Sequence, residues 1–163
     1  MVGLRVHITV QYATSRRNVP AARTLRIWVQ SALLECAPKL RPTPYSLTVR
    51  IVSAAESRTL NRQWRGKDKP TNVLSFSYSS ASAYSLAPST FLLGDLVICA
   101  PVVAREAREQ GKTLSAHWAH MVVHGVLHLL GHDHVKNRDA KKMAAREVEI
   151  LSHFGYQDPY LSR

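Results

Sequence analysis

Residues 122–134 read Val122-Val123-His124-Gly125-Val126-Leu127-His128-Leu129-Leu130-Gly131-His132-Asp133-His134, and the prediction of the fold starts from this segment. Residues four apart on an α-helix lie on one face, so His124 and His128 can offer ring nitrogens to one point in space. Gly131 predicts the left-handed backbone that ends a helix and lets the chain turn back with His134. The apolar residues between the histidines predict that this helix is buried, which would hold a metal site rigidly.

Three imidazole ligands leave a fourth coordination position for water or substrate, which is typical of a catalytic zinc site. We therefore predict that His124, His128 and His134 bind one zinc ion. Other pairings are open, because His120 and His124 are also four residues apart and His117 lies one turn earlier. The later trio is favoured because it alone includes the helix-ending glycine and a returning loop.

The neighbouring polar residues have alternative readings. His120 is either a residue that supports a ligand or transfers a proton, or an ordinary core or surface histidine. His132 is expected to face solvent. Asp133 can orient a ligand or cap the turn.

The position after His124 separates this segment from a familiar protease pattern. Metalloproteases with the motif His-Glu-x-x-His-x-x-Gly-x-x-His use the glutamate as general base, whereas Gly125 stands here. A phosphodiester substrate fits the absence of that base, because a metal and an arginine can stabilise its charge and the ribose hydroxyl of RNA is a potential nucleophile.

A second segment, residues 61–76, is basic and includes a tryptophan and a glycine. Arg65, Lys67 and Lys69 are predicted to contact substrate phosphates, and Trp64 offers a surface on which a base can stack. The alternative is a charged loop that is merely solvated.

These segments resemble the YbeY family of metal-dependent endoribonucleases. The resemblance rests on the signature at His124–His134, the loop at Asn61–Phe76, the segment Leu93–Ile98 and the tail Gly155–Tyr160. It implies that His124, His128 and His134 are zinc ligands, that His124 and Arg65 are catalytic, and that Arg65 acts on the scissile phosphate.

The resemblance also implies a biological task, which is ribosomal RNA processing, including maturation of the small-subunit RNA 3′ end, and ribosome quality control. The ribosome or a small-subunit ribosomal protein would then be a partner. The sequence departs from the family pattern at Trp64, where tyrosine is common, at Ser77, where proline is usual, and over residues 77–90. These departures concern substrate preference rather than the metal site.

The net charge of +11 is unevenly distributed. Residues 1–80 hold thirteen lysines and arginines against three acidic residues, whereas the rest is nearly balanced. This asymmetry indicates a polyanionic partner. RNA explains it better than a membrane, because no basic amphipathic helix is evident, and no DNA partner is expected.

Alternating apolar residues predict four strands, over residues 4–11, 47–51, 73–78 and 92–99. Helix start and stop signals predict helices that begin at Pro20, Ser53, Pro101, Thr113 and Asp139 and end before Pro38, near Leu60, near Gly111, at Leu130 and near His153. Without strict alternation, this order predicts an α+β fold over residues 1–163. We expect one domain with a small, mixed four-stranded sheet covered by helices and a zincin-like metal helix.

Location and redox state follow from other features. The first predicted strand starts almost at residue 1, which leaves no room for a removable leader, and no apolar run approaches membrane-spanning length. A cytoplasmic protein is expected, with Cys36 and Cys99 as buried thiols.

Two rival functions stay open. A metalloprotease shares the ligand spacing but would need another base. A non-catalytic RNA-binding or ribosome assembly factor would use zinc structurally, and the metal would then contribute folding free energy outright.

Overall fold

The computed structural model describes residues 5–36, 44–78, 90–131 and 137–161. In these ranges the chain forms four strands and five helices. Their order is β1 (Val6–Tyr12), α1 (Ala22–Glu35), β2 (Tyr45–Val52), α2 (Ala54–Arg65), β3 (Val73–Ser77), β4 (Phe91–Cys99), α3 (Ala100–Glu109), α4 (Leu114–Leu129) and α5 (Asn137–Ser152).

The strands form one mixed sheet in the order β1-β2-β4-β3. The first three are parallel, and β3 pairs antiparallel with β4. The predicted mixed four-stranded α+β architecture is therefore confirmed. All four predicted strands form, each within two residues of the expected ends.

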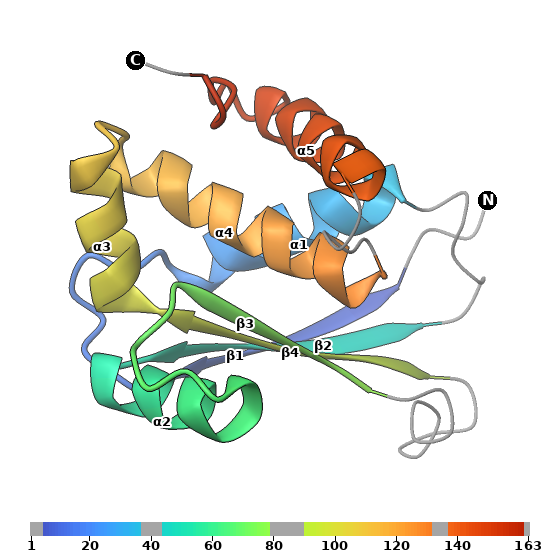
Figure 1. Cartoon of the computed structure of the whole chain (residues 1–163). Coiled ribbons are helices and arrows are strands. Elements are labelled where there is room, and N and C mark those ends of the chain that lie inside the picture. Colours follow the sequence, from blue (N-terminus) through green and yellow to red (C-terminus); the bar gives the residue numbers. More distant parts are fainter. Residues whose placement is uncertain (1–4, 37–43, 79–89, 132–136, 162–163) are drawn as a thin grey trace.

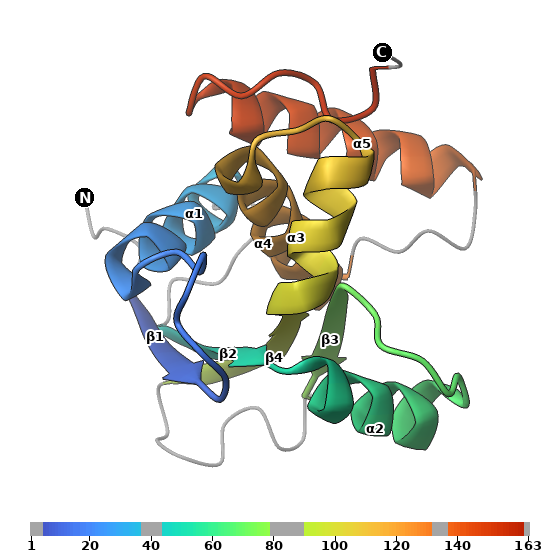
Figure 2. The ribbon, with the colours of Figure 1, turned by 90° about the vertical axis from the view of Figure 1, so that its left-hand side faces the viewer.

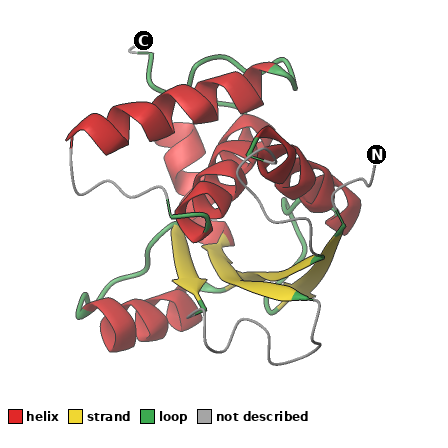
Figure 3. Cartoon of the chain, turned by 90° about the vertical axis from the view of Figure 1, so that its right-hand side faces the viewer, coloured by secondary structure: helices red, strands yellow, loops and turns green. Residues whose placement is uncertain are grey.

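Helices cover both faces of the sheet. In Figures 1 and 2, α1, α3 and α4 lie on one face and α2 lies on the other. Figure 3 shows α5 on the outside of the helical layer, farthest from the sheet. Because α4 contacts β3, β4, α1, α3 and α5, it occupies the centre of the core, as its apolar sequence predicted.

Gly125 permits the close approach of α4 to the sheet. A Cβ atom at this position would lie 2.8 Å from Cδ2 of Leu96 in β4, which is closer than such atoms come in proteins. The glycine that follows His124 thus has a packing reason as well as a chemical consequence. Gly131 has φ +90°, so the predicted left-handed residue after the helix is confirmed.

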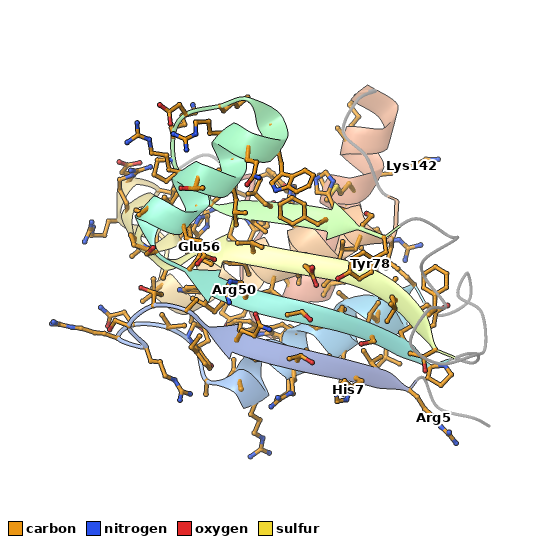
Figure 4. All side chains as sticks on the ribbon, turned by 90° about the horizontal axis from the view of Figure 1, so that it is seen from below. Arg5, His7, Arg50, Glu56, Tyr78 and Lys142 are labelled. Carbon is orange, nitrogen blue, oxygen red and sulfur yellow. The ribbon has the colours of Figure 1, made fainter. Side chains whose placement is uncertain are left out.

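The capping predictions hold for two helices. The hydroxyl of Thr113 accepts a hydrogen bond from the N–H of Ala116, and the hydroxyl of Ser53 accepts one from the N–H of Glu56. The Glu56 carboxylate does not complete a capping box, because it accepts two hydrogen bonds from the Arg50 guanidinium. Figure 4 shows this pair on the α2 side of the sheet.

Two helix boundaries were predicted wrongly. Helix α2 continues past Leu60 to Arg65, where Gly66 caps it with φ +70°. Its last turn is exposed, and its one apolar residue, Trp64, does not continue a helical apolar pattern. Helix α5 begins at Asn137, which places Asp139 inside the first turn instead of before it.

Two further expectations concern single features. Cys36 and Cys99 are buried and no disulfide joins them, as predicted. None of the described helices is long and apolar enough to cross a membrane.

Candidate metal centre

Four histidines at helical spacing form a row along α4, in the order His117, His120, His124 and His128. The ring centroids of successive pairs lie 6.1, 6.0 and 4.7 Å apart. Exposure increases along the row, since His117 and His120 are buried and the other two are partly accessible. The row therefore runs from the core to an open pocket.

The two accessible histidines converge as their spacing predicted. Nε2 of His124 lies 3.1 Å from Nε2 of His128. Two histidine nitrogens that bind one zinc at about 2.0–2.1 Å lie roughly 3.3 Å apart in a tetrahedral site. The observed separation therefore suits a shared ion. His134, with His132 and Asp133, lies outside the described residues.

Glu147 from α5 is the main site residue that the sequence prediction missed. Its side chain is completely buried. Oε1 accepts a hydrogen bond from Nδ1 of His124 at 2.5 Å, and Oε2 accepts one from Nε2 of His120 at 2.8 Å and another from the hydroxyl of Tyr160. A signal existed in the sequence, because this acid interrupts the apolar face formed by Met143, Ile150 and Leu151.

Ionisation of this cluster follows from its hydrogen bonds. Burial raises the pKa of Glu147, but the hydrogen bonds and charge interactions with His120 and His124 outweigh that effect and bring it to about 2. Burial and the neighbouring carboxylate raise the pKa of Tyr160. At neutral pH the cluster is thus a buried carboxylate surrounded by three donors.

His120, His124 and Glu147 also form a group that can hold a metal ion. Each offers one nitrogen or oxygen atom, and these atoms all lie within 4.8 Å of one another. His120, which the sequence left undecided between supporting a ligand and packing in the core, is therefore part of the site.

Arg65 and Trp64 lie beside the histidines. A pocket of about 510 Å³ is lined by the end of α2, by β3 and its preceding residues, and by α4; the lining residues are Trp64, Arg65, Thr71, Asn72, Val73, Leu74, Ser75, Phe76, His124 and His128. Among the described residues, no carboxylate lies within ion-pair distance of Arg65. Trp64 is 65% exposed, and its ring packs edge-on against that of Phe76 with 6.0 Å between the ring centroids.

Side-chain hydrogen bonds connect the basic segment after α2 to that helix. Arg58 makes two hydrogen bonds to Asp68, and the buried amide of Asn61 donates to the carbonyl of Lys69. Lys67 and Lys69 are exposed and lie outside the lining of the pocket that holds Arg65. Arg65, but neither lysine, lines the same pocket as His124 and His128.

A second hollow, of about 460 Å³, is also lined by His124. It shares Asn72 and His124 with the first pocket and adds residues from α3, from the start of α4 and from the C-terminal segment, including Glu106, His117, His120 and Tyr160. His124 thus lines both pockets.

Comparisons with known proteins agree with this geometry. The family described as Endoribonuclease YbeY matches residues 9–155. Proteins named Endoribonuclease YbeY from Stenotrophomonas maltophilia strains K279a and R551-3 are each 50% identical over 157 residues, covering 96% of this chain and 94% of the relative.

A solved structure supports the fold. The solution structure of TM1509 from Thermotoga maritima superposes with a TM-score of 0.57 at 25% identity, covering 95% of this chain and 99% of that one. With a family match over most of the chain and relatives at 50% identity, the chain belongs to the endoribonuclease YbeY family.

Proposed function

We propose that this protein is a zinc-dependent, single-strand-specific endoribonuclease that acts in the cytoplasm on ribosomal RNA. Family membership gives the reaction class, which is hydrolysis of RNA phosphodiester bonds. Maturation of the small-subunit RNA 3′ end and ribosome quality control are the proposed tasks, with the ribosome or a small-subunit ribosomal protein as partner. The observation that carries the proposal is the convergence of His124 and His128 in the pocket that also holds Arg65.

The proposed ligands of the metal are His124, His128 and His134. Two of them already present Nε2 atoms at a separation that suits one ion, and neutral imidazole is a preferred zinc ligand. When bound, the ion would supply Lewis-acid stabilisation of negative charge on the scissile phosphate. His124 is catalytic in this proposal through the metal that it binds.

Arg65 is the proposed electrostatic partner of the scissile phosphate. It lies on the last turn of α2, which Gly66 ends, and it lines the pocket of His124 and His128. A planar guanidinium can donate two parallel hydrogen bonds to a phosphate. Because no described carboxylate pairs with it, no ion pair has to break when substrate binds.

The residues around Arg65 are proposed to hold the RNA strand. Trp64 offers an exposed ring for base stacking, which favours an unpaired strand over a duplex. Lys67 and Lys69 are proposed to guide the backbone from outside the pocket, so RNA affinity should fall as salt rises. The excess positive charge of residues 1–80 acts in the same direction.

The test is cleavage of an unstructured RNA oligonucleotide by purified protein. It is run beside a chelated sample, a zinc-restored sample and an Arg65→Ala variant from the same preparation. Cleavage that follows zinc and is lost with Arg65 supports the proposal and excludes a contaminating nuclease.

No cleavage by folded, zinc-loaded protein, of either the oligonucleotide or intact ribosomes, would contradict the proposal. It would favour the non-catalytic assembly factor with a structural zinc. Thermal unfolding of the chelated sample separates the two, because loss of a structural zinc unfolds the chain, whereas a catalytic site loses activity and keeps its fold.

A further inference from the structure

The carboxylate of Glu147 is buried, and its ion-pair neighbours among the described residues are histidines. It is 0% exposed, and no described lysine or arginine lies within ion-pair distance, since its ion-pair neighbours are His120 and His124. A buried charge is costly unless it is paired or bound to a metal. Two imidazoles and a hydroxyl give it hydrogen bonds, and an imidazole is charged only when it is protonated. The surroundings of Glu147 therefore fit a cation bound close by.

The geometry argues against direct coordination by Glu147. Its Oε1 lies 2.5 Å from Nδ1 of His124. Two atoms that bind one zinc at about 2.0–2.2 Å lie roughly 3 Å or more apart. The observed separation is instead that of a short, charge-assisted hydrogen bond, in which Nδ1 of His124 donates its proton to the carboxylate.

That hydrogen bond determines the state of the other ring nitrogen. With the proton on Nδ1, Nε2 of a neutral His124 has a lone pair, and this is the atom that lies 3.1 Å from Nε2 of His128. Carboxylates that bind a histidine ligand in this way fix its tautomer and ring orientation and make it a better metal ligand.

We propose that Glu147 is a positioning residue of the metal centre, which holds His124 as the Nδ1–H tautomer and offsets the charge of the ion without coordinating it. This inference rests on the proposed function, because it takes His124 and His128 as ligands. His120 and Tyr160 hold the second carboxylate oxygen, and so fix the plane of the carboxylate. Through Tyr160, the segment after α5 contributes to the metal centre.

A matched control is the pair of Glu106 and His117, because His117 lies on α4 two turns before His124. Glu106 from α3 accepts a hydrogen bond from Nε2 of His117 at 3.0 Å. The other nitrogen of His117, Nδ1, is buried and has no hydrogen-bond partner in the described part of the chain, and His117 does not line the pocket that holds His124 and His128. Glu106→Gln therefore removes a carboxylate from a histidine that binds no metal in this proposal.

The experiment measures zinc affinity by competition with a chromophoric chelator for the wild type and for Glu147→Gln, Glu106→Gln and His128→Ala. Glu147→Gln should weaken zinc binding roughly 10- to 100-fold. Glu106→Gln should leave zinc affinity unchanged, and His128→Ala should weaken it more than Glu147→Gln. Nitrogen NMR of the zinc-free wild type should show His124 with its proton on Nδ1, a readout that needs no variant to fold.

Several outcomes would overturn the inference. One is wild-type zinc affinity in Glu147→Gln, and another is His124 with its proton on Nε2. Retention of zinc by His128→Ala together with its loss from Glu147→Gln would place the ion on His120, His124 and Glu147 directly. A wild type that binds no zinc at all would overturn the proposed function as well, which distinguishes that failure from failure of the inference alone.

Discussion

The two ends of α4 carry the same chemical pair in different settings. At the start of the helix, His117 binds the carboxylate of Glu106, which is 23% exposed and also accepts from the amide of Asn72. Near its end, His124 binds the carboxylate of Glu147, which is completely buried. Both pairs tie α4 to another helix.

The difference between these pairs lies in the second nitrogen of each imidazole. That nitrogen is buried and lacks a described partner in His117, whereas in His124 it meets His128 at the edge of an open pocket. A carboxylate–histidine pair is therefore not by itself a sign of function. It becomes one when the other nitrogen can reach a ligand.

The largest expected effect separates the two ends directly. His128→Ala should lower zinc affinity by more than about 100-fold, beyond what loss of a supporting carboxylate produces, and should abolish RNA cleavage. His117→Ala should keep zinc affinity and lose about 1–3 kcal/mol of stability, because Glu106 loses a buried partner. Chelator competition measures the zinc affinity, and urea unfolding measures the stability. An equal loss of zinc affinity in the two variants would contradict the difference proposed between the two ends of α4.

The next effect concerns the cation that faces the functional end. Arg65→Lys should lower kcat by about 100-fold while the protein stays folded and binds zinc, because an ammonium cannot donate two parallel hydrogen bonds to a phosphate. Arg62→Lys is the control, since Arg62 lies one turn earlier on α2 and outside the pocket lining. A fully active, zinc-loaded Arg65→Lys enzyme would rule out the role proposed for Arg65.

A smaller effect is expected at Tyr160. Tyr160→Phe removes one of three donors to Glu147, so zinc affinity should fall by less than about 10-fold, below the loss expected for the carboxylate itself. Tyr156→Phe provides the control, because its hydroxyl contacts Ser115 away from the histidine row. Chelator competition compares the zinc affinities of the two variants. Equal zinc affinities would argue that Tyr160 does not support the metal centre through Glu147.

The smallest expected effect is a pH dependence of the free energy of unfolding, caused by His117 at the start of α4. Burial lowers the pKa of His117 below 6.5, against the opposing influence of Glu106, and Lys112 and His120 lower it further. The unfolded chain therefore binds a proton more readily, so the free energy of unfolding should fall as pH drops below about 6.5. In metal-free protein, His117→Gln should reduce this loss by at most about 1.4 kcal/mol per pH unit. Urea unfolding between pH 7.5 and 5.0 measures this dependence. The prediction is contradicted if the free energy of unfolding of His117→Gln falls with pH as steeply as that of the wild type.

The sequence was most informative where the interactions are local. The i, i+4 spacing of His124 and His128 is a property of one helix, and the structure shows their Nε2 atoms converging as that spacing predicts. The caps at Ser53 and Thr113 act over three residues and were predicted correctly. The end of α2 was predicted too early because its last turn is exposed and packs no apolar face against the core.

Residues that meet across the fold were harder to predict. Glu147 lies 23 residues beyond His124 on another helix, and its role depends on how α5 packs against α4. Arg65 was assigned through the family resemblance, not from spacing, because it joins the histidines only when α2 and α4 line a common pocket with β3. Lys67 and Lys69 share its sequence neighbourhood but not its pocket.

The sequence by itself determined the helix that carries the histidines, the set of strands and the basic half of the chain. Periodicity, helix caps and charge depend only on residues that are close together in the sequence. Only the tertiary structure decided that β3 runs antiparallel at the sheet edge, that Glu147 binds His124 and Tyr160, and that Arg65 lines the same pocket as His128. The physical reason is that such contacts depend on how separate elements bury their apolar faces together, and no local pattern specifies the partner across the core.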